Sequence, residues 1–172
     1  MYNQAVRIPG LGTFAVVRKR VAGKEKDLVV VERPVFHLAK STARDHDLRY
    51  ACTDVPGHQH CEQLPYAQIA SDNAVSESTV QLCLQRTIRL FHVCLENRKN
   101  VALIWRDVGM LIVQRKDVKM TFYVDFLKRL NGTEKMLQAV LEMPEMRDLV
   151  ISRQDTAASQ TSSGRVIILP GR

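Results

Sequence analysis

Four residues near position 58 are of the types that bind a metal ion: Cys52, His58, His60 and Cys61. Thiolate and imidazole groups are the usual ligands of structural zinc. Their spacing, however, matches neither a pair of C-x-x-C motifs nor a C-x-x-C motif followed by two spaced histidines. Two interpretations stay open: a zinc site, or a linker that carries these residue types without binding metal.

A second group could in principle do acid-base chemistry, because His37 and His46 stand near Asp45 and Asp47. Catalysis by a triad also needs a nucleophile in a defined turn, and none accompanies them. The glycines of residues 10–12 precede a strand-like run, whereas a phosphate-binding glycine loop opens a helix. We therefore expect no enzymatic activity and no cofactor.

A basic run is the third candidate. The net charge is +7, and residues 1–50 carry ten basic and five acidic side chains, so most of the excess lies there. The residues concerned are Arg18, Lys19, Arg20, Lys24 and Lys26. Such a stripe suits contacts with nucleic-acid phosphates. It equally suits a solvated hairpin whose charges protect a sheet edge from aggregation.

The composition indicates the class of protein to which these candidate residues belong. With 172 residues, 45% hydrophobic and 25% charged, the chain is of ordinary globular type and has room for one domain or two small ones. It has no run of about 18 apolar residues and no secretory pattern at its start. We expect an intracellular protein without membrane contact, in which Cys83 and Cys94 are reduced and buried.

The elements that would position these residues begin with β structure over residues 5–38. Apolar residues alternate on both sides of a turn at Pro9 and Gly10, and residues 28–31 form a β-branched run after a polar tip. Residues 51–64 are rich in Gly, His, Pro and Gln and lack periodicity, which is typical of a linker.

Residues 65–142 change to a helical pattern and then return to strands. Ser76 is a good N-cap for a helix whose apolar stripe is Val80, Leu84, Ile88, Phe91 and Leu95. A shorter helix precedes it around residues 66–70. Strands are expected at 101–105, 109–113 and 118–123, and short helices at 125–130 and 134–141, separated by a C-cap at residues 131–132.

The two strand regions align as an internal repeat. Residues 6–16 parallel residues 101–113, and each copy has a glycine, Gly12 or Gly109, near the start of its second strand. A glycine there permits a close backbone approach that a Cβ would forbid. The alignment also sets residues 34–36 against residues 123–126. We expect structural roles for Gly12, Gly109, Phe14 and Phe126.

Residues 8–14, Ile-Pro-Gly-Leu-Gly-Thr-Phe, resemble the strand-turn signature of the bacterial histone-like HU and integration-host-factor family. Residues 118–132 more narrowly resemble the second of the tandem HU-like domains in the animal coiled-coil domain-containing protein 81 group. The resemblance implies an α+β fold with two N-terminal helices, a three-stranded antiparallel sheet with a short arm, and C-terminal helices. It covers about residues 1–150.

The resemblance also implies a domain organisation. Residues 1–50 would be a truncated first HU-like domain without its N-terminal helices, 51–64 a linker, 65–150 a complete second domain, and 151–172 a mostly flexible tail in which residues 166–169 could dock as a strand. Because a three-stranded sheet with one apolar face needs a cover, we expect the first copy to dock on the second domain or on a partner. The copies would pair within the chain or through self-association.

The function implied by the resemblance is a non-enzymatic protein-interaction or scaffold module at the centrosome, centriole or ciliary base, with protein partners. Trp105 and Arg106 are the candidate interface residues, since exposed aromatic residues beside arginine are common anchors. Trp105 could equally be core. The alternative is residual DNA binding through the basic hairpin and a nuclear location, although both arms are short and their tips lack the proline wedge of HU proteins.

Overall fold

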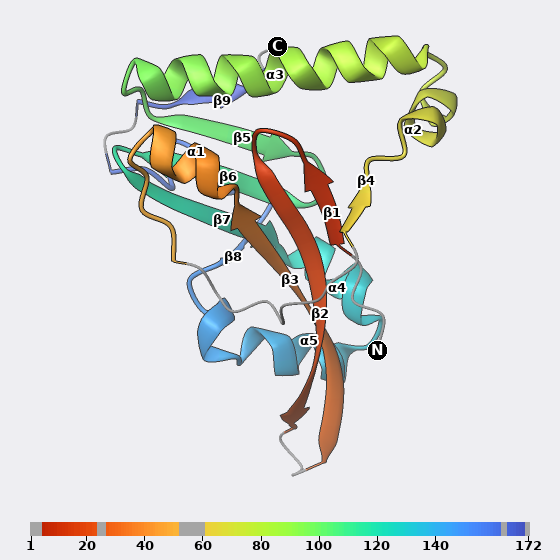
Figure 1. Cartoon of the computed structure of the whole chain (residues 1–172). Helices are drawn as coiled ribbons and strands as arrows, with labels where there is room; N and C mark the ends of the chain where they lie inside the picture. Colours follow the sequence, from red (N-terminus) through yellow and green to blue (C-terminus); the bar gives the residue numbers. More distant parts are fainter. Residues whose placement is uncertain (1–4, 24–26, 52–60, 163–164, 171–172) are drawn as a thin grey trace.

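The structure is a computed structural model that describes residues 5–23, 27–51, 61–162 and 165–170. It is a mixed α+β fold, as expected, with two sheets and several helices (Figure 1). The elements are β1 (Ala5–Ile8), β2 (Gly12–Ala22), β3 (Leu28–Leu38), α1 (Lys40–Asp45), β4 (Cys61–Gln63), α2 (Tyr66–Asp72), α3 (Glu77–Glu96), β5 (Val101–Trp105), β6 (Gly109–Gln114), β7 (Asp117–Tyr123), α4 (Val124–Asn131), α5 (Glu134–Leu141), a 3₁₀ turn (Pro144–Met146), β8 (Val150–Ile151) and β9 (Ile167–Leu169). Below, residues 5–50 are called the first unit and residues 65–150 the second unit.

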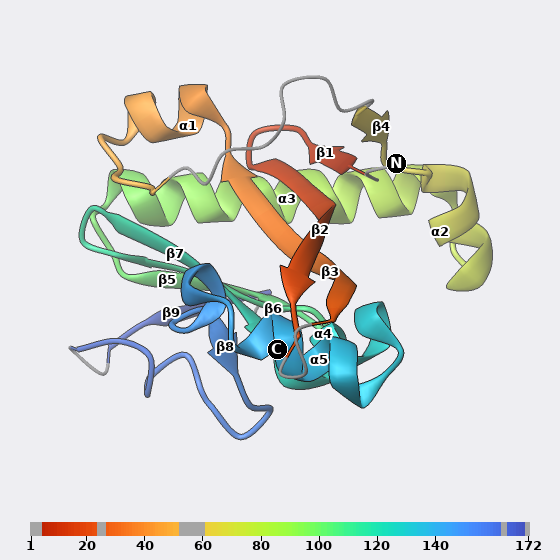
Figure 2. The same ribbon diagram turned by 90° about the horizontal axis from the view of Figure 1, so that it is seen from below.

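The first sheet has the strand order β3-β2-β1-β4. β2 and β3 pair over their whole length, from Gly12 opposite Leu38 to Ala22 opposite Leu28. Figure 2 shows this hairpin reaching from the β1 and α1 side of the molecule to α4 and α5, against which β3 packs. β4 lies within the segment expected to be a linker and pairs in parallel with β1.

The second sheet has the order β8-β7-β6-β5-β9. Its three central strands are antiparallel and match the expected ones. The tail supplies both outer strands: β9 pairs in parallel with β5, and β8 with β7. The tail expected to be mostly flexible therefore contributes ordered structure to both edges, with β9 where residues 166–169 were expected to dock.

The helices begin and end where their local chemistry dictates. Ser76 caps α3 by accepting a hydrogen bond from the Thr79 amide at 3.1 Å. α4 ends at Gly132, whose φ of +69° favours glycine, and Thr133 caps α5. α3 crosses one end of the molecule, beside β9 and β5 (Figure 1). Among the helices of the described residues, none is long and apolar enough to cross a bilayer.

The two strand regions make matching backbone contacts. The Leu11 amide donates to the Ile8 carbonyl at 3.1 Å, and the Val108 amide donates to the Trp105 carbonyl at 2.9 Å. An amide at the end of the third strand closes each unit. Ala39, just after β3, donates to the Leu11 carbonyl, and Tyr123, the last residue of β7, donates to the Val108 carbonyl, both at 2.9 Å. The order strand-turn-strand-strand-helix thus occurs twice with the same hydrogen bonds.

Gly12 and Gly109 occupy similar places, each at the start of the second strand of an antiparallel pair. An added Cβ would lie 2.1 Å from the His37 carbonyl oxygen at Gly12, and 1.9 Å from the Thr121 carbonyl oxygen at Gly109. This register makes Leu38 the counterpart of Phe122. The alignment of residues 34–36 with residues 123–126 was therefore wrong, because pairing across strands sets the register and the aromatic residues do not.

One apolar core joins the two units. It contains Phe36 and Leu38 of the first unit together with Phe91, Leu111 and Phe122 of the second. Burying each such side chain contributes about 1.5–3 kcal/mol. The first unit, expected to need a cover, has its apolar residues against α3, α4 and α5.

A buried side chain, Asn131 at the end of α4, fixes how β3 sits against the second unit. Its Oδ1 accepts from the Glu32 amide at 2.9 Å, and its Nδ2 donates to the Glu32 carbonyl at 3.0 Å and to the Leu127 carbonyl at 2.9 Å. The amide therefore satisfies both backbone groups of one β3 residue, as a neighbouring strand would.

We predict that Gly109→Ala and Gly12→Ala each lower the free energy of unfolding by about 3 kcal/mol or more, because the new Cβ meets backbone that must move apart. Gly132→Ala is the matched control. Its φ is positive but nothing lies within 4 Å of the added Cβ, so its cost should be about 1–2 kcal/mol. Urea denaturation measures all three, and equal costs at Gly109 and Gly132 would contradict the close strand approach.

Candidate interaction surface

Trp105 stands at the seam between the two units. It ends β5, opposite Gly109 of β6, and its ring is half-buried. The Phe14 ring of the first unit meets it edge-on with ring centroids 5.2 Å apart, and Phe14 in turn lies 4.7 Å from Phe36. Trp105 is therefore neither deep core nor fully exposed: it forms part of a wall shared by both units.

An apolar pocket of about 240 Å³ opens beside this wall. Its lining comes from β1, β2 and β3 of the first unit and from β5, its following turn, β7 and α4 of the second. The lining residues are Val6, Ile8, Phe14, Ala15, Val16, Pro34, Trp105, Val108, Phe122 and Phe126. Neither unit alone could form it. Phe14 and Phe126, expected to be structural, both line this pocket.

The indole Nε1 of Trp105 is inaccessible to solvent and has no hydrogen-bond partner among the described residues. A buried donor without an acceptor costs about 1–3 kcal/mol relative to a paired one. The seam therefore carries an unsatisfied polar group directly beside an apolar hollow. Arg106, the other expected interface residue, is exposed in the turn that follows.

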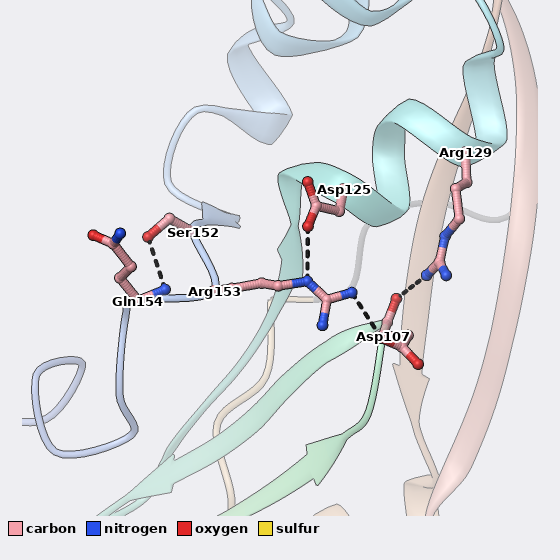
Figure 3. Close-up of polar contacts among 6 residues, drawn as sticks. All are labelled: Asp107, Asp125, Arg129, Ser152, Arg153 and Gln154. Carbon is pink, nitrogen blue, oxygen red and sulfur yellow. Dashed lines mark hydrogen bonds and ion pairs between the residues drawn. The ribbon is translucent and has the colours of Figure 1, made fainter.

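A network of charges holds that turn in place (Figure 3). The Asp107 backbone has a φ of +66°, and its carboxylate accepts from Arg153 Nη2 at 2.7 Å. Arg153 Nε also donates to Asp125 at 2.7 Å, and Arg129 donates to the Asp107 carbonyl. Because α4 and the tail both contact Asp107, the turn after Trp105 is fixed from two sides.

The charge network shifts the pKa values of Asp107 and Arg153. The hydrogen bond from Arg153, more than any other contact, holds the pKa of Asp107 below its ordinary value. The same bond raises the pKa of Arg153 above its ordinary value, helped by the bond to Asp125. Two of the cations also stack: the Arg129 guanidinium lies 5.8 Å from the centroid of the Phe126 ring, and Arg153 lies 5.8 Å from that of Tyr123.

The basic run lies on the β2–β3 hairpin, and two of its cations contact carboxylates of the protein. Arg18 pairs with Glu32 at 2.8 Å, and Lys19 pairs with Glu145 at 2.6 Å. The bond from Lys19 lowers the pKa of Glu145. Arg20 is exposed. Lys24 and Lys26 lie outside the described residues.

Of the four possible metal ligands, only Cys61 lies within the described residues; Cys52, His58 and His60 lie outside them. Cys61 is exposed on β4. Over residues 5–23, 27–51, 61–162 and 165–170, the structure holds no group of three His, Cys, Asp or Glu side chains placed to bind a metal.

The expected acid-base candidates do not converge. His37 is half-buried on β3, where burial and, secondarily, Arg33 lower its pKa. Asp47 pairs with Lys116 of the second unit, which lowers the Asp47 pKa. His46 caps the end of α1 and contacts another histidine, His92, which sequence reasoning did not single out.

The second unit has the order helix, helix, three antiparallel strands, helix, helix, which with its short β6–β7 turn is the expected order for an HU-like domain. The comparison with known families agrees. Residues 60–134 match the family described as CCDC81 eukaryotic HU domain 2, which identifies this segment as similar to the second HU-like domain of that group. The resemblance seen in the sequence is thus confirmed for this part of the chain.

We predict that Arg153→Gln raises the pKa of Asp107 towards the ordinary value of an aspartate, because the charged hydrogen bond that favours the carboxylate is lost. The titration can be followed by the side-chain carboxyl carbon in NMR. Lys116→Gln, which acts on Asp47, is the control and should leave Asp107 unchanged. An unaltered Asp107 pKa in Arg153→Gln would show that the pair does not form in solution.

Proposed function

We propose that this chain is a non-enzymatic protein-interaction module, in which an HU-like domain is preceded by a shortened copy of the same unit. The matching backbone hydrogen bonds and the equivalent glycines support the shortened copy. The shared core supports pairing of the two units within one chain rather than through self-association. The observation that carries the function is the apolar pocket at Trp105, which exists only where the units meet.

The pocket suits one kind of occupant: a bulky apolar side chain of a partner protein, flanked by acidic residues. Its lining is aromatic and aliphatic, and it has far more room than one water molecule needs. The charge beside it is positive. Arg106 is exposed next to Trp105, and Arg129 lies over the Phe126 ring that lines the pocket. Together with Arg153, these cations outnumber the two carboxylates, Asp107 and Asp125, that Arg153 contacts.

We propose, on the resemblance to the CCDC81 group, that such a partner is a protein of the centrosome, the centriole or the ciliary base. Its support is the family match over residues 60–134. Proximity labelling in cells that express the full chain tests it, since the placement requires centrosomal or ciliary neighbours.

DNA binding through the first hairpin is the weaker alternative. Counterion release on binding requires cations that are free to face phosphates. Arg18 and Lys19 are instead paired with Glu32 and Glu145, and β3 of the same hairpin packs against α4 and α5. These pairs reduce the positive charge that the hairpin presents.

We predict that peptides with one Leu or Phe between glutamates bind the full chain and shift the NMR signals of the Trp105 indole and the Val108 amide. Peptides flanked by lysines should bind much more weakly. Val16→Phe, which fills the pocket from β2, should weaken binding at least tenfold. Val17→Phe is the matched control, because Val17 packs with Ala5, Ala15 and Val35 and does not line the pocket.

Binding that is indifferent to Val16→Phe would place the peptide elsewhere and refute the pocket as the docking site. Equal binding of acidic and basic peptides would refute the charge argument while leaving the pocket in place. Circular dichroism of both variants establishes that they fold.

We also predict that duplex DNA does not bind the chain measurably near 0.15 M salt. Fluorescence anisotropy over a range of salt concentrations is the measurement, with Arg20→Ala beside the triple replacement of residues 18–20 by alanine. A steep fall of affinity with salt, abolished by the triple replacement, would instead establish the hairpin as a nucleic-acid contact.

A further inference from the structure

A pair of histidines joins the first unit to α3. His46 follows the end of α1, and His92 lies about one turn before the end of α3. The Nε2 atom of His46 is 2.8 Å from the Nδ1 atom of His92, and the ring centroids are 5.0 Å apart. His92 Nε2 lies 2.7 Å from the Gly10 carbonyl oxygen. The result is a chain of hydrogen bonds from α1 through α3 to the β1–β2 turn.

The Gly10 carbonyl is the fixed end of this chain, because it can only accept hydrogen bonds. It also accepts from Thr42 Oγ1 at 3.0 Å, and Thr42 is buried. The turn itself lies close to α3: a Cβ on Gly10 would be 3.2 Å from Ile88 Cγ2, and the φ of Gly10 is +76°. The carbonyl therefore cannot easily turn away from His92.

The proton positions follow from that constraint. His92 must carry its proton on Nε2 to donate to Gly10, so the Nδ1 atom of neutral His92 is an acceptor. His46 must then carry its proton on Nε2 to donate to His92. One further proton can be added at His46 Nδ1 without breaking the chain. When His46 is already doubly protonated, however, a proton on His92 Nδ1 sets two N–H groups against each other.

We propose that the His46–His92 pair is a pH-sensitive latch, which holds the first unit on α3 while at most one extra proton is bound and releases it when both rings are cationic. Two cationic imidazoles at hydrogen-bond distance repel each other, and neither facing N–H group finds an acceptor in the other ring. The docked state accepts fewer protons than the released state, so acid favours release.

Charged groups around the pair partly offset the lowering of the His46 pKa but do not reverse it. Burial, and secondarily the neighbouring His92, lower the pKa of His46, while Glu96 of α3 and Asp45 of α1 act in the opposite direction. Arg44 contacts Asp45 at 3.5 Å, and Arg89 of α3 lines the same groove as His92. The β1–β2 turn, Pro9–Leu11, adds no ionisable side chain.

The two facing ring nitrogens set the sign, and the lowered pKa of His46 agrees with it. The docked contact is at full strength above the ordinary histidine pKa, near 6.5, and weakens as the pH falls below it. Release would uncover the surface of α3 around Leu84 and Ile88, which now faces Pro9 and Gly10. The proposal rests on the histidine pair alone and requires no occupant in the Trp105 pocket.

Amide hydrogen exchange of the full chain tests the latch, because the repeat supplies its own control. The Leu11 and Ala39 amides report the turn held by His92, and the Val108 and Tyr123 amides occupy the equivalent places in the second unit. Between pH 7.5 and 5, protection factors at Leu11 and Ala39 should fall at least tenfold more than those at Val108 and Tyr123.

His46→Gln should remove most of this difference, because an amide side chain can present either a donor or an acceptor to His92. An equal loss in the wild type and in His46→Gln would overturn the proposal, as would protection at Leu11 and Ala39 that follows the second unit. Imidazole nitrogen NMR of the wild type is a second measurement: a neutral His92 protonated on Nδ1 would also overturn it.

Discussion

The molecule depends on one constraint: a small sheet with one apolar face must be covered. Here the cover is mutual, since the first unit and the second unit share a single core with α3, α4 and α5. Asn131 sets the alignment by satisfying both backbone groups of Glu32. The Trp105 pocket and the histidine contact both exist because of this packing, since each takes groups from both units.

The same packing reduces the positive charge that residues 18–20 present to a ligand. In the sequence, the basic run of residues 18–20 suggests a surface that binds nucleic-acid phosphates. In the fold, β3 packs on α4 and α5. Lys19 pairs with Glu145 in the 3₁₀ turn after α5, and Arg18 pairs with Glu32 across the hairpin. Folding therefore brings Lys19 to a carboxylate that is distant in the sequence, and Arg18 to one on the neighbouring strand.

Local signals in the sequence were good guides where the interaction itself is local. The apolar stripe of α3, its cap at Ser76 and the break at Gly132 all depend on residues within one or two turns. The alignment of residues 34–36 failed because strand register is set by a distant partner. β8 and β9 have two and three residues, too few to show a period, and the His46–His92 contact joins residues that no motif links.

The outer strands β8 and β9 belong to the same folded unit as the segment that matches the family. The family match ends at residue 134, within the first turn of α5, yet α5 packs on β3, and β8 and β9 supply the outer strands of the second sheet. A chain shortened to the matched segment would expose the backbone groups along β5 and β7 and invite association through those edges. The matched segment is therefore smaller than the packed unit to which its strands and helices belong.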